Sequence, residues 1–233
     1  MKVAFGIAAL AIALATPASA AFVTVDMTPA INGNWSQQSF PTVPQGNVTL
    51  GGVNFQIASQ NGFAAYRGFT GSGSQSYTFS TNVFGVTNVY SLLNTFWGSS
   101  TPNLHSVTVN ATGGLSQVFA IDGNDDVRDY LNNVYTNTIN GTTTTNVFAD
   151  GRYRIDRQQF QLAAAFANET LTSITFNDNG ADGTSRLVLT GLTLETADLA
   201  GAVPEPATWA MMVLGFGAVG GALRARRRGL ALA

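Results

Sequence analysis

The chain has 233 residues, no cysteine and one histidine, His105. These counts exclude a disulfide framework, a cysteine-based zinc or redox site, and any mechanism that needs two imidazoles. Between residues 21 and 203 there are twelve acidic residues, six arginines and no lysine, a net charge of about −6. Such a body lacks the basic face that phosphate binding requires, so nucleic acid is not a partner.

The first 20 residues have the pattern of a secretory signal peptide. Lys2 precedes an apolar run over residues 3–15, and the small residues Ala18 and Ala20 occupy the −3 and −1 positions of a cleavage site. The sequence therefore predicts cleavage by signal peptidase and export of a mature chain that begins at Ala21.

The body that follows shows the period-two alternation of β-strands and almost no helical periodicity. Glycine and asparagine clusters, such as those at residues 113–114 and 179–180, mark turns between the alternating segments. Residues 162–166 are expected to form at most one helical turn. The expected strands are residues 22–27, 48–57, 75–80, 86–92, 106–110, 117–121, 144–149, 153–160, 172–176 and 186–194. This pattern favours an all-β fold: a single β-sandwich of jelly-roll type over residues 21–200.

An acidic loop at residues 122–126 places Asp122, Asn124 and Asp126 at the i, i+2 and i+4 spacing from which calcium can collect oxygen ligands. The loop lacks the glycine and the glutamate of an EF-hand, and such residues also cap their own backbone in ordinary turns. A second oxygen-rich loop lies at residues 177–183. Two interpretations stay open, a calcium site or a turn whose charge is balanced by neighbouring Arg128, and we expect the second.

Arginines and aspartates also lie close together at residues 126–129 and 154–157. We expect bidentate arginine–carboxylate pairs that tie strands together, with Arg128 paired to Asp126 or Asp129. Paired carboxylates for glycoside hydrolysis stay chemically open, but no spacing selects two, so no catalytic residue is assigned. His105, alone beside the start of a strand, is expected to be a surface or capping residue.

Four aromatic residues are candidates for stacking on sugar rings: Trp35, Tyr66, Tyr90 and Trp97. Trp97 precedes a polar loop, which favours a rim position. Core packing is the alternative for all four, and is the one we expect, because large aromatic side chains are mostly buried.

Residues 207–223 form an uncharged segment near the C-terminus. A helix over this segment would be about 25 Å long, close to the roughly 30 Å hydrocarbon core of a bilayer. Trp209 would lie at the outer interface, and the arginines that follow would stay cytoplasmic. The segment is therefore expected to anchor the chain in the cytoplasmic membrane, transiently or permanently.

The whole tail, residues 201–233, combines a Pro-Glu-Pro triplet, a tryptophan and an arginine cluster in a fixed order: Pro204, Glu205, Pro206, Trp209, Arg226, Arg227 and Arg228. It resembles the PEP-CTERM sorting signal of Gram-negative bacteria, in the PEPxxW variant also described as the ice-binding-protein C-terminal region. The resemblance covers about residues 203–228. It implies recognition by a membrane exosortase, processing near the triplet, and release to the cell surface or matrix. The two prolines would hold the processing site extended, as a protease or transpeptidase requires.

Within the body, residues 89–98, 127–129, 154–156 and 160–162 resemble a β-sandwich module of exported bacterial proteins that is similar to galactose-binding-like jelly rolls. This resemblance covers about residues 60–195. It implies contact with carbohydrate or matrix and assigns no ligand residue.

Together these features predict an exported, non-enzymatic protein of the cell surface or the exopolysaccharide matrix of a biofilm, with no cofactor. Its sandwich would bind exopolysaccharide weakly or serve as a structural component. The alternatives are a glycan-active hydrolase that uses paired carboxylates and a calcium-dependent adhesion module.

Overall fold

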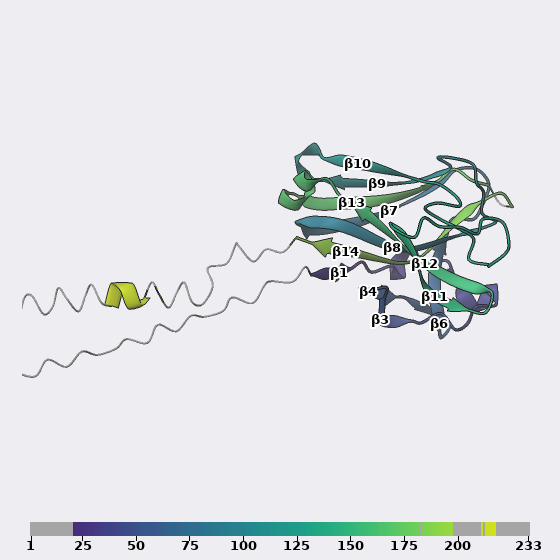
Figure 1. The fold of residues 1–233 in the computed structure, drawn as a ribbon, viewed down its shortest axis with the longest axis horizontal. Helices are drawn as coiled ribbons and strands as arrows, with labels where there is room; N and C mark the ends of the chain where they lie inside the picture. The colour runs from purple at the N-terminus through teal and green to yellow at the C-terminus, as the bar shows by residue number, and fades with distance from the viewer. Residues whose placement is uncertain (1–20, 182, 198–210, 212, 218–233) are drawn as a thin grey trace, which may run out of the picture. The chain divides into compact units, whose positions relative to one another are not determined.

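The structure is a computed structural model that describes residues 21–181, 183–197, 211 and 213–217 (Figure 1). The predicted signal peptide, the Pro-Glu-Pro triplet, Trp209 and the arginine cluster lie outside these residues. Residues 211 and 213–217 of the predicted membrane segment are helical. Within the described part of the chain, no helix has the length and apolar character needed to cross a membrane.

Residues 21–181 and 183–197 form one compact unit that is mostly β-structure. Four short 3-10 helices interrupt it: η1 (Thr28–Ala30), η2 (Trp35–Gln38), η3 (Thr112–Gly114) and η4 (Ala164–Asn168). Its strands are β1 (Phe22–Thr24), β2 (Gly33–Asn34), β3 (Gly46–Leu50), β4 (Val53–Ile57), β5 (Ser59–Gln60), β6 (Phe63–Gly68), β7 (Gln75–Phe84), β8 (Val86–Phe96), β9 (His105–Ala111), β10 (Ser116–Ile121), β11 (Thr144–Asp150), β12 (Tyr153–Gln161), β13 (Thr170–Asp178) and β14 (Arg186–Thr196).

Two antiparallel sheets form a sandwich. The larger sheet has the order β11-β12-β8-β14-β6-β2, with β1 beside β14 and β5 beside β6, and the smaller has the order β10-β9-β13-β7. Figure 1 shows the smaller sheet above β8 and β14. Apolar side chains of both sheets, including Leu189, Val109 and Phe176, form a shared core. The predicted sandwich is confirmed, because alternate residues of these strands do point into one apolar layer.

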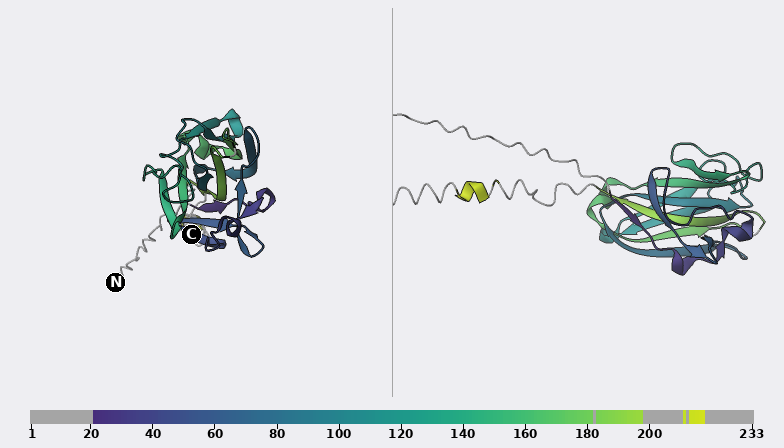
Figure 2. Two further views of the ribbon diagram at one scale, coloured as in Figure 1. Left: turned by 90° about the vertical axis from the view of Figure 1, so that its right-hand side faces the viewer. Right: turned by 90° about the horizontal axis from the view of Figure 1, so that it is seen from below.

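The larger sheet buries its other face as well. The β3–β4 hairpin and η2 cover it, and a second core forms around Trp35, Phe55 and Leu92. In Figure 2 the purple and dark blue N-terminal segments gather along one side of the body. Strands β8 and β14 are therefore buried almost continuously, as expected for strands covered on both faces.

The strand expected at residues 48–57 is wrong in one respect, because it is a hairpin of β3 and β4. Gly51 and Gly52 have φ of 57° and 79°, which turns the chain between the two strands. Strand β6 was not predicted, since its residues are buried on consecutive positions and do not alternate. The helical turn expected at residues 162–166 is present as η4.

Candidate ligand-binding site

Residues 122–143 connect β10 to β11 and form a long segment without a named strand of their own. Loops of this length within a compact domain are usually functional or disordered. Here the segment is well organised, because Thr95 N–H donates to Arg128 O at 3.0 Å and Arg154 N–H donates to Tyr130 O at 2.9 Å. These bonds place residues 128–130 between the end of β8 and the start of β12.

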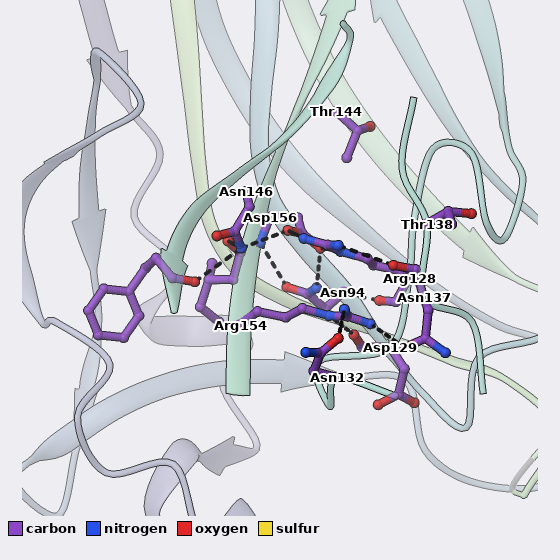
Figure 3. Close-up of polar contacts among 12 residues, drawn as sticks. Asn94, Arg128, Asp129, Asn132, Asn137, Thr138, Thr144, Asn146, Arg154 and Asp156 are labelled. Carbon is purple, nitrogen blue, oxygen red and sulfur yellow. Dashed lines mark hydrogen bonds and ion pairs between the residues drawn. The ribbon is translucent and has the colours of Figure 1, made fainter. Parts of the chain in front are cut away.

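Arg128 anchors this segment to β12 through Asp156, which is fully buried (Figure 3). Its Nε donates to Asp156 Oδ2 and its Nη2 to Asp156 Oδ1, both at 2.7 Å. Asn94 Nδ2 and Asn146 Nδ2 also donate to the same carboxylate, at 2.9 and 3.0 Å. The expected bidentate pair therefore exists, but its expected partner was wrong. In the described residues no ion pair joins Arg128 to Asp126 or Asp129.

Arg154 organises the same segment from within. Its guanidinium donates to the backbone oxygens of Asp129, Leu131 and Thr136 at 2.8–3.1 Å. It also donates to the side-chain oxygens of Asn132 and Asn137, toward which Figure 3 shows it pointing. The buried arginine thus supplies donors to the backbone carbonyl groups of Asp129, Leu131 and Thr136.

The segment closes one side of a pocket with a volume of about 230 Å³. Five aromatic side chains line it, together with a small set of polar residues and one carboxyl group. The aromatic residues are Tyr66, Phe96, Trp97, Tyr130 and Tyr135, and the other lining residues are Asn32, Gln38, Gly68, Thr70, Asp129 and Leu131. A mostly aromatic wall with a few polar groups is the usual composition of a small-molecule site.

Trp35 packs against this aromatic wall from the protein interior. It is fully buried, and its ring lies 5.0 Å from that of Tyr66 and 5.4 Å from that of Tyr130, centre to centre. Its indole Nε1 donates to Thr190 Oγ1 at 3.1 Å. Gln38, at the end of η2, donates to the Tyr66 hydroxyl and accepts from the Tyr130 hydroxyl. These contacts fix the orientations of both phenol rings.

Two of the aromatic residues have left-handed backbone conformations, with φ of 55° at Trp97 and 50° at Tyr135. Bulky residues rarely adopt this region, which costs about 1–3 kcal/mol each and is concentrated at functional sites. Gly98, which follows Trp97, allows Thr136 to lie close to the backbone there, because a Cβ at Gly98 would lie 2.0 Å from Thr136 Oγ1. The chain thus maintains strained geometry where it presents Trp97 and Tyr135 to the pocket.

Asp129 is the carboxyl group of this pocket and is 1% exposed. Its Oδ1 accepts from Leu131 N–H at 2.8 Å, and its Oδ2 accepts from Gly98 N–H at 3.2 Å. Burial raises the pKa of Asp129 to about 6, although these N–H groups and the charge of Arg154 act against the shift. Asp129 is therefore ionised at neutral pH and protonated in mild acid.

The four aromatic stacking candidates separate clearly. Trp35, Tyr66 and Tyr90 are buried in the second core, as expected, whereas Trp97 is half-buried; Trp97 and Tyr66 line the pocket. Tyr90 lies outside the pocket and donates to Glu195 Oε2 at 3.0 Å. Tyr135 and Tyr130 were missed, because residues 127–143 lack the alternation that marks a strand. The positive φ of Tyr135 also has no signal in the sequence.

The predicted calcium ligands accept backbone hydrogen bonds, from within the loop and from more distant segments. Asp122 Oδ1 accepts from Asn103 N–H at 2.5 Å, Asp126 Oδ2 from Asp122 N–H at 3.1 Å, and Asn124 Oδ1 from Asn137 N–H at 2.7 Å. Among the described residues no cluster of three or more His, Cys, Asp or Glu side chains is arranged to hold a metal ion. Burial and the charges of Asp125 and Asp122 raise the pKa of Asp126, against the hydrogen bond from Asp122 N–H.

His105 is 2% exposed, so its expected surface position was wrong. Its Nε2 lies 2.9 Å from Ser185 Oγ and its Nδ1 lies 3.5 Å from Asp178 Oδ1. Arg186 Nη1 donates to the same Asp178 oxygen at 3.2 Å, and all four side chains are buried. The order Ser–His–Asp is that of a hydrolase triad, and this cluster joins β9, β13 and β14 in the protein interior.

Comparisons with known proteins concern the body and the tail separately. No curated protein matches the chain in sequence. The solved structure of a family two carbohydrate esterase from Cellvibrio japonicus is 12% identical, over 77% of this chain and 34% of that chain, with a TM-score of 0.31. This chain thus spans about a third of the esterase, and a likeness at this level says nothing about function. Residues 202–228 match the PEP-CTERM protein-sorting motif, so the resemblance carried by Pro204, Glu205, Pro206 and the C-terminal arginines is confirmed.

Proposed function

We propose that this chain is a non-enzymatic protein of the cell surface or exopolysaccharide matrix whose aromatic pocket binds carbohydrate. The PEP-CTERM motif implies an exported protein that an exosortase recognises. Anchoring in the cytoplasmic membrane, processing near Pro206 and release to the surface are the finer steps that we propose for this tail. For the sandwich we propose the jelly-roll type.

The observation that carries carbohydrate binding is the composition of the pocket. Sugar rings present apolar C–H faces and polar hydroxyl edges, so they favour aromatic walls with a few hydrogen-bonding groups. Trp97 and Tyr135 lie at the outer part of the wall, and Tyr135 is 57% exposed. Pockets for drug-sized ligands occupy roughly 300–1,000 Å³. A volume of about 230 Å³ suits a smaller group, such as one sugar unit of a chain.

The geometry favours binding over hydrolysis at this pocket. Glycoside hydrolysis generally uses two carboxyl groups about 5–9.5 Å apart across the scissile bond. Asp129 is the one carboxyl among the described residues that line the pocket. Its raised pKa would suit a general acid, but a second carboxylate to act as nucleophile or base does not line the same space.

The test is a glycan array probed with the full chain in mild detergent, with and without calcium, followed by titration calorimetry of the hits. We expect binding to at least one glycan, and Trp97→Ala should weaken it about tenfold or more, since stacking is lost. Phe84→Ala is the matched control, because Phe84 is 50% exposed on β7 and does not line the pocket. Equal loss in both variants, or no glycan binding at all, would contradict the proposal. Release of reducing ends from a bound glycan would favour the hydrolase.

A further inference from the structure

We propose that the pocket selects carbohydrate that carries a free amino group, and that Asp129 pairs with the ammonium of that sugar. This inference rests on the proposed carbohydrate binding and names the chemical class of its ligand.

The residues that line the pocket carry a net negative charge. Among the described residues that line the pocket, Asp129 is the one charged side chain, and none is arginine, lysine or histidine. Aromatic rings add to this field, because their faces are negative and attract cations within about 6 Å of the ring centre. A wall of five aromatic residues around one carboxylate therefore repels an anionic sugar and favours a cationic one.

The Asp129 carboxylate can accept more hydrogen bonds than the backbone N–H groups around it donate. An ionised carboxylate offers about four lone-pair positions. Leu131 N–H and Gly98 N–H occupy one on each oxygen, and Trp97 N–H adds a further favourable contact. At least one position is left for a donor that enters the pocket, and an ammonium is the strongest donor for it because the resulting hydrogen bond is charge-assisted.

Arg154 is the positive group whose charge acts on the Asp129 carboxylate. Among the described residues, its hydrogen bonds go to backbone oxygens and to Asn132 and Asn137, and none goes to the Asp129 side chain. Arg154 thus stabilises the negative charge of Asp129 and leaves the carboxylate oxygens available to a ligand in the pocket. Its pKa is lowered to about 10, mainly by burial, so it stays charged at neutral pH.

Protonation of Asp129 gives the interaction a predictable pH dependence. The groups that face Asp129 are Arg154, from β12, and Tyr130, whose pKa burial raises to about 12. Both keep their charge state between pH 5 and 8. Asp129 itself, with a pKa of about 6, loses its charge in mild acid. Preference for an ammonium should therefore fall as the pH drops below about 6.

The experiment compares two probes, a glucosamine tetramer and its fully N-acetylated counterpart, by titration calorimetry against the full chain in mild detergent at pH 7. The two differ in the charged amine and keep the same sugar rings and linkages. We expect the glucosamine tetramer to bind about tenfold more tightly. Asp129→Asn should reduce this ratio several-fold, toward the smaller preference that the aromatic rings give by themselves, and Phe84→Ala should leave it unchanged. Circular dichroism checks that Asp129→Asn is folded.

A second measurement does not depend on any variant. For the wild-type chain, the ratio of the two affinities should fall several-fold between pH 6 and pH 4, a range in which the amine of the probe stays an ammonium while Asp129 takes up a proton. If the acetylated tetramer binds as tightly at pH 7, or the ratio does not respond to pH, the amino-sugar inference is wrong while carbohydrate binding stands. If neither probe nor any arrayed glycan binds, both proposals are wrong.

Discussion

Arg128 and Asp156 form a bidentate ion pair with two bonds of 2.7 Å, and Asp156 is completely buried. Arg128 lies in the segment between β10 and β11, and Asp156 lies in the middle of β12. The pair therefore fastens a segment that has only isolated bridges to β8 and β12 to the centre of the larger sheet. Asn94 and Asn146 satisfy further acceptor positions of the carboxylate, as a buried charge requires.

Removing Arg128 should destabilise the protein strongly, because it would leave Asp156 charged and unpaired in the interior. We expect Arg128→Ala to lower the free energy of unfolding by about 3–5 kcal/mol, measured by chemical denaturation. Arg128→Lys keeps the charge but supports only one of the two bonds, so its effect should be smaller. A loss below about 1 kcal/mol for Arg128→Ala would show that the pair does not hold the segment.

Arg154 and Arg152 lie two residues apart, but their substitution should have very different effects on the free energy of unfolding. Arg154 is buried and makes five hydrogen bonds to residues 129–137, whereas Arg152 is exposed and lies over the Tyr153 ring at 5.9 Å. We expect Arg154→Met to cost about 3 kcal/mol or more, since several carbonyl groups lose their donors. Arg152→Ala should cost less than about 1 kcal/mol. Similar losses in both variants would argue against an organising role of Arg154.

Acidification should stabilise the protein through Asp129. The pKa of Asp129 is about 6 in the folded state against 3.8 in a model compound, so the folded state takes up this proton first as the pH falls. The free energy of unfolding should therefore rise by about 1–3 kcal/mol between pH 7 and pH 4 and gain nothing more from Asp129 below that.

The control for this pH dependence is Asp129→Asn. Asp126, whose pKa is also raised, contributes in the same direction in both proteins. Asp178 acts oppositely: burial favours its neutral form, but the nearby His105 and the hydrogen bond from Leu187 N–H outweigh this and lower its pKa. Its contribution is lost only below the ordinary carboxyl range. Identical pH profiles for the variant and the wild type would contradict the role of Asp129.

Chelation of divalent cations should leave the melting temperature unchanged. The oxygens of Asp122, Asn124 and Asp126 already accept backbone hydrogen bonds, so the turn is satisfied without a cation. Calorimetric scans with excess calcium and with chelator test this directly. A drop of several degrees on chelation that disappears in Asp122→Ala/Asp126→Ala would instead favour the calcium-dependent adhesion module.

The mature surface protein should lack the residues that follow about Pro206. The PEP-CTERM motif at residues 202–228 is the basis of this prediction, because exosortase recognition implies processing near the triplet. Mass spectrometry of protein extracted from the cell surface measures the C-terminus. Intact peptides that contain Arg226 to Arg228 in that fraction would favour a permanent anchor.

The sequence by itself determined the sorting tail and the sandwich class. The tail is a linear motif, so Pro204, Glu205 and Pro206 can be read without knowledge of a fold. The strands of the sandwich leave a local signal for a related reason, since alternation along residues 106–110 or 172–176 follows from one face being buried. One strand was nevertheless predicted with the wrong extent, because the pair Gly51-Gly52 divides the expected strand at residues 48–57 into the β3–β4 hairpin.

Only the tertiary structure decided the pocket and the partners of the charged residues. Arg128 lies next to Asp126 and Asp129 in sequence but pairs with Asp156, because a strand brings that carboxylate to it from 28 positions away. Trp97 and Tyr135 likewise line one pocket. They do so because Gly98 N–H donates to Asp129 and because Arg154 donates to residues 129–137. Such long-range contacts depend on how β8 and β12 pair, and strand pairing is not encoded in the local pattern of either strand.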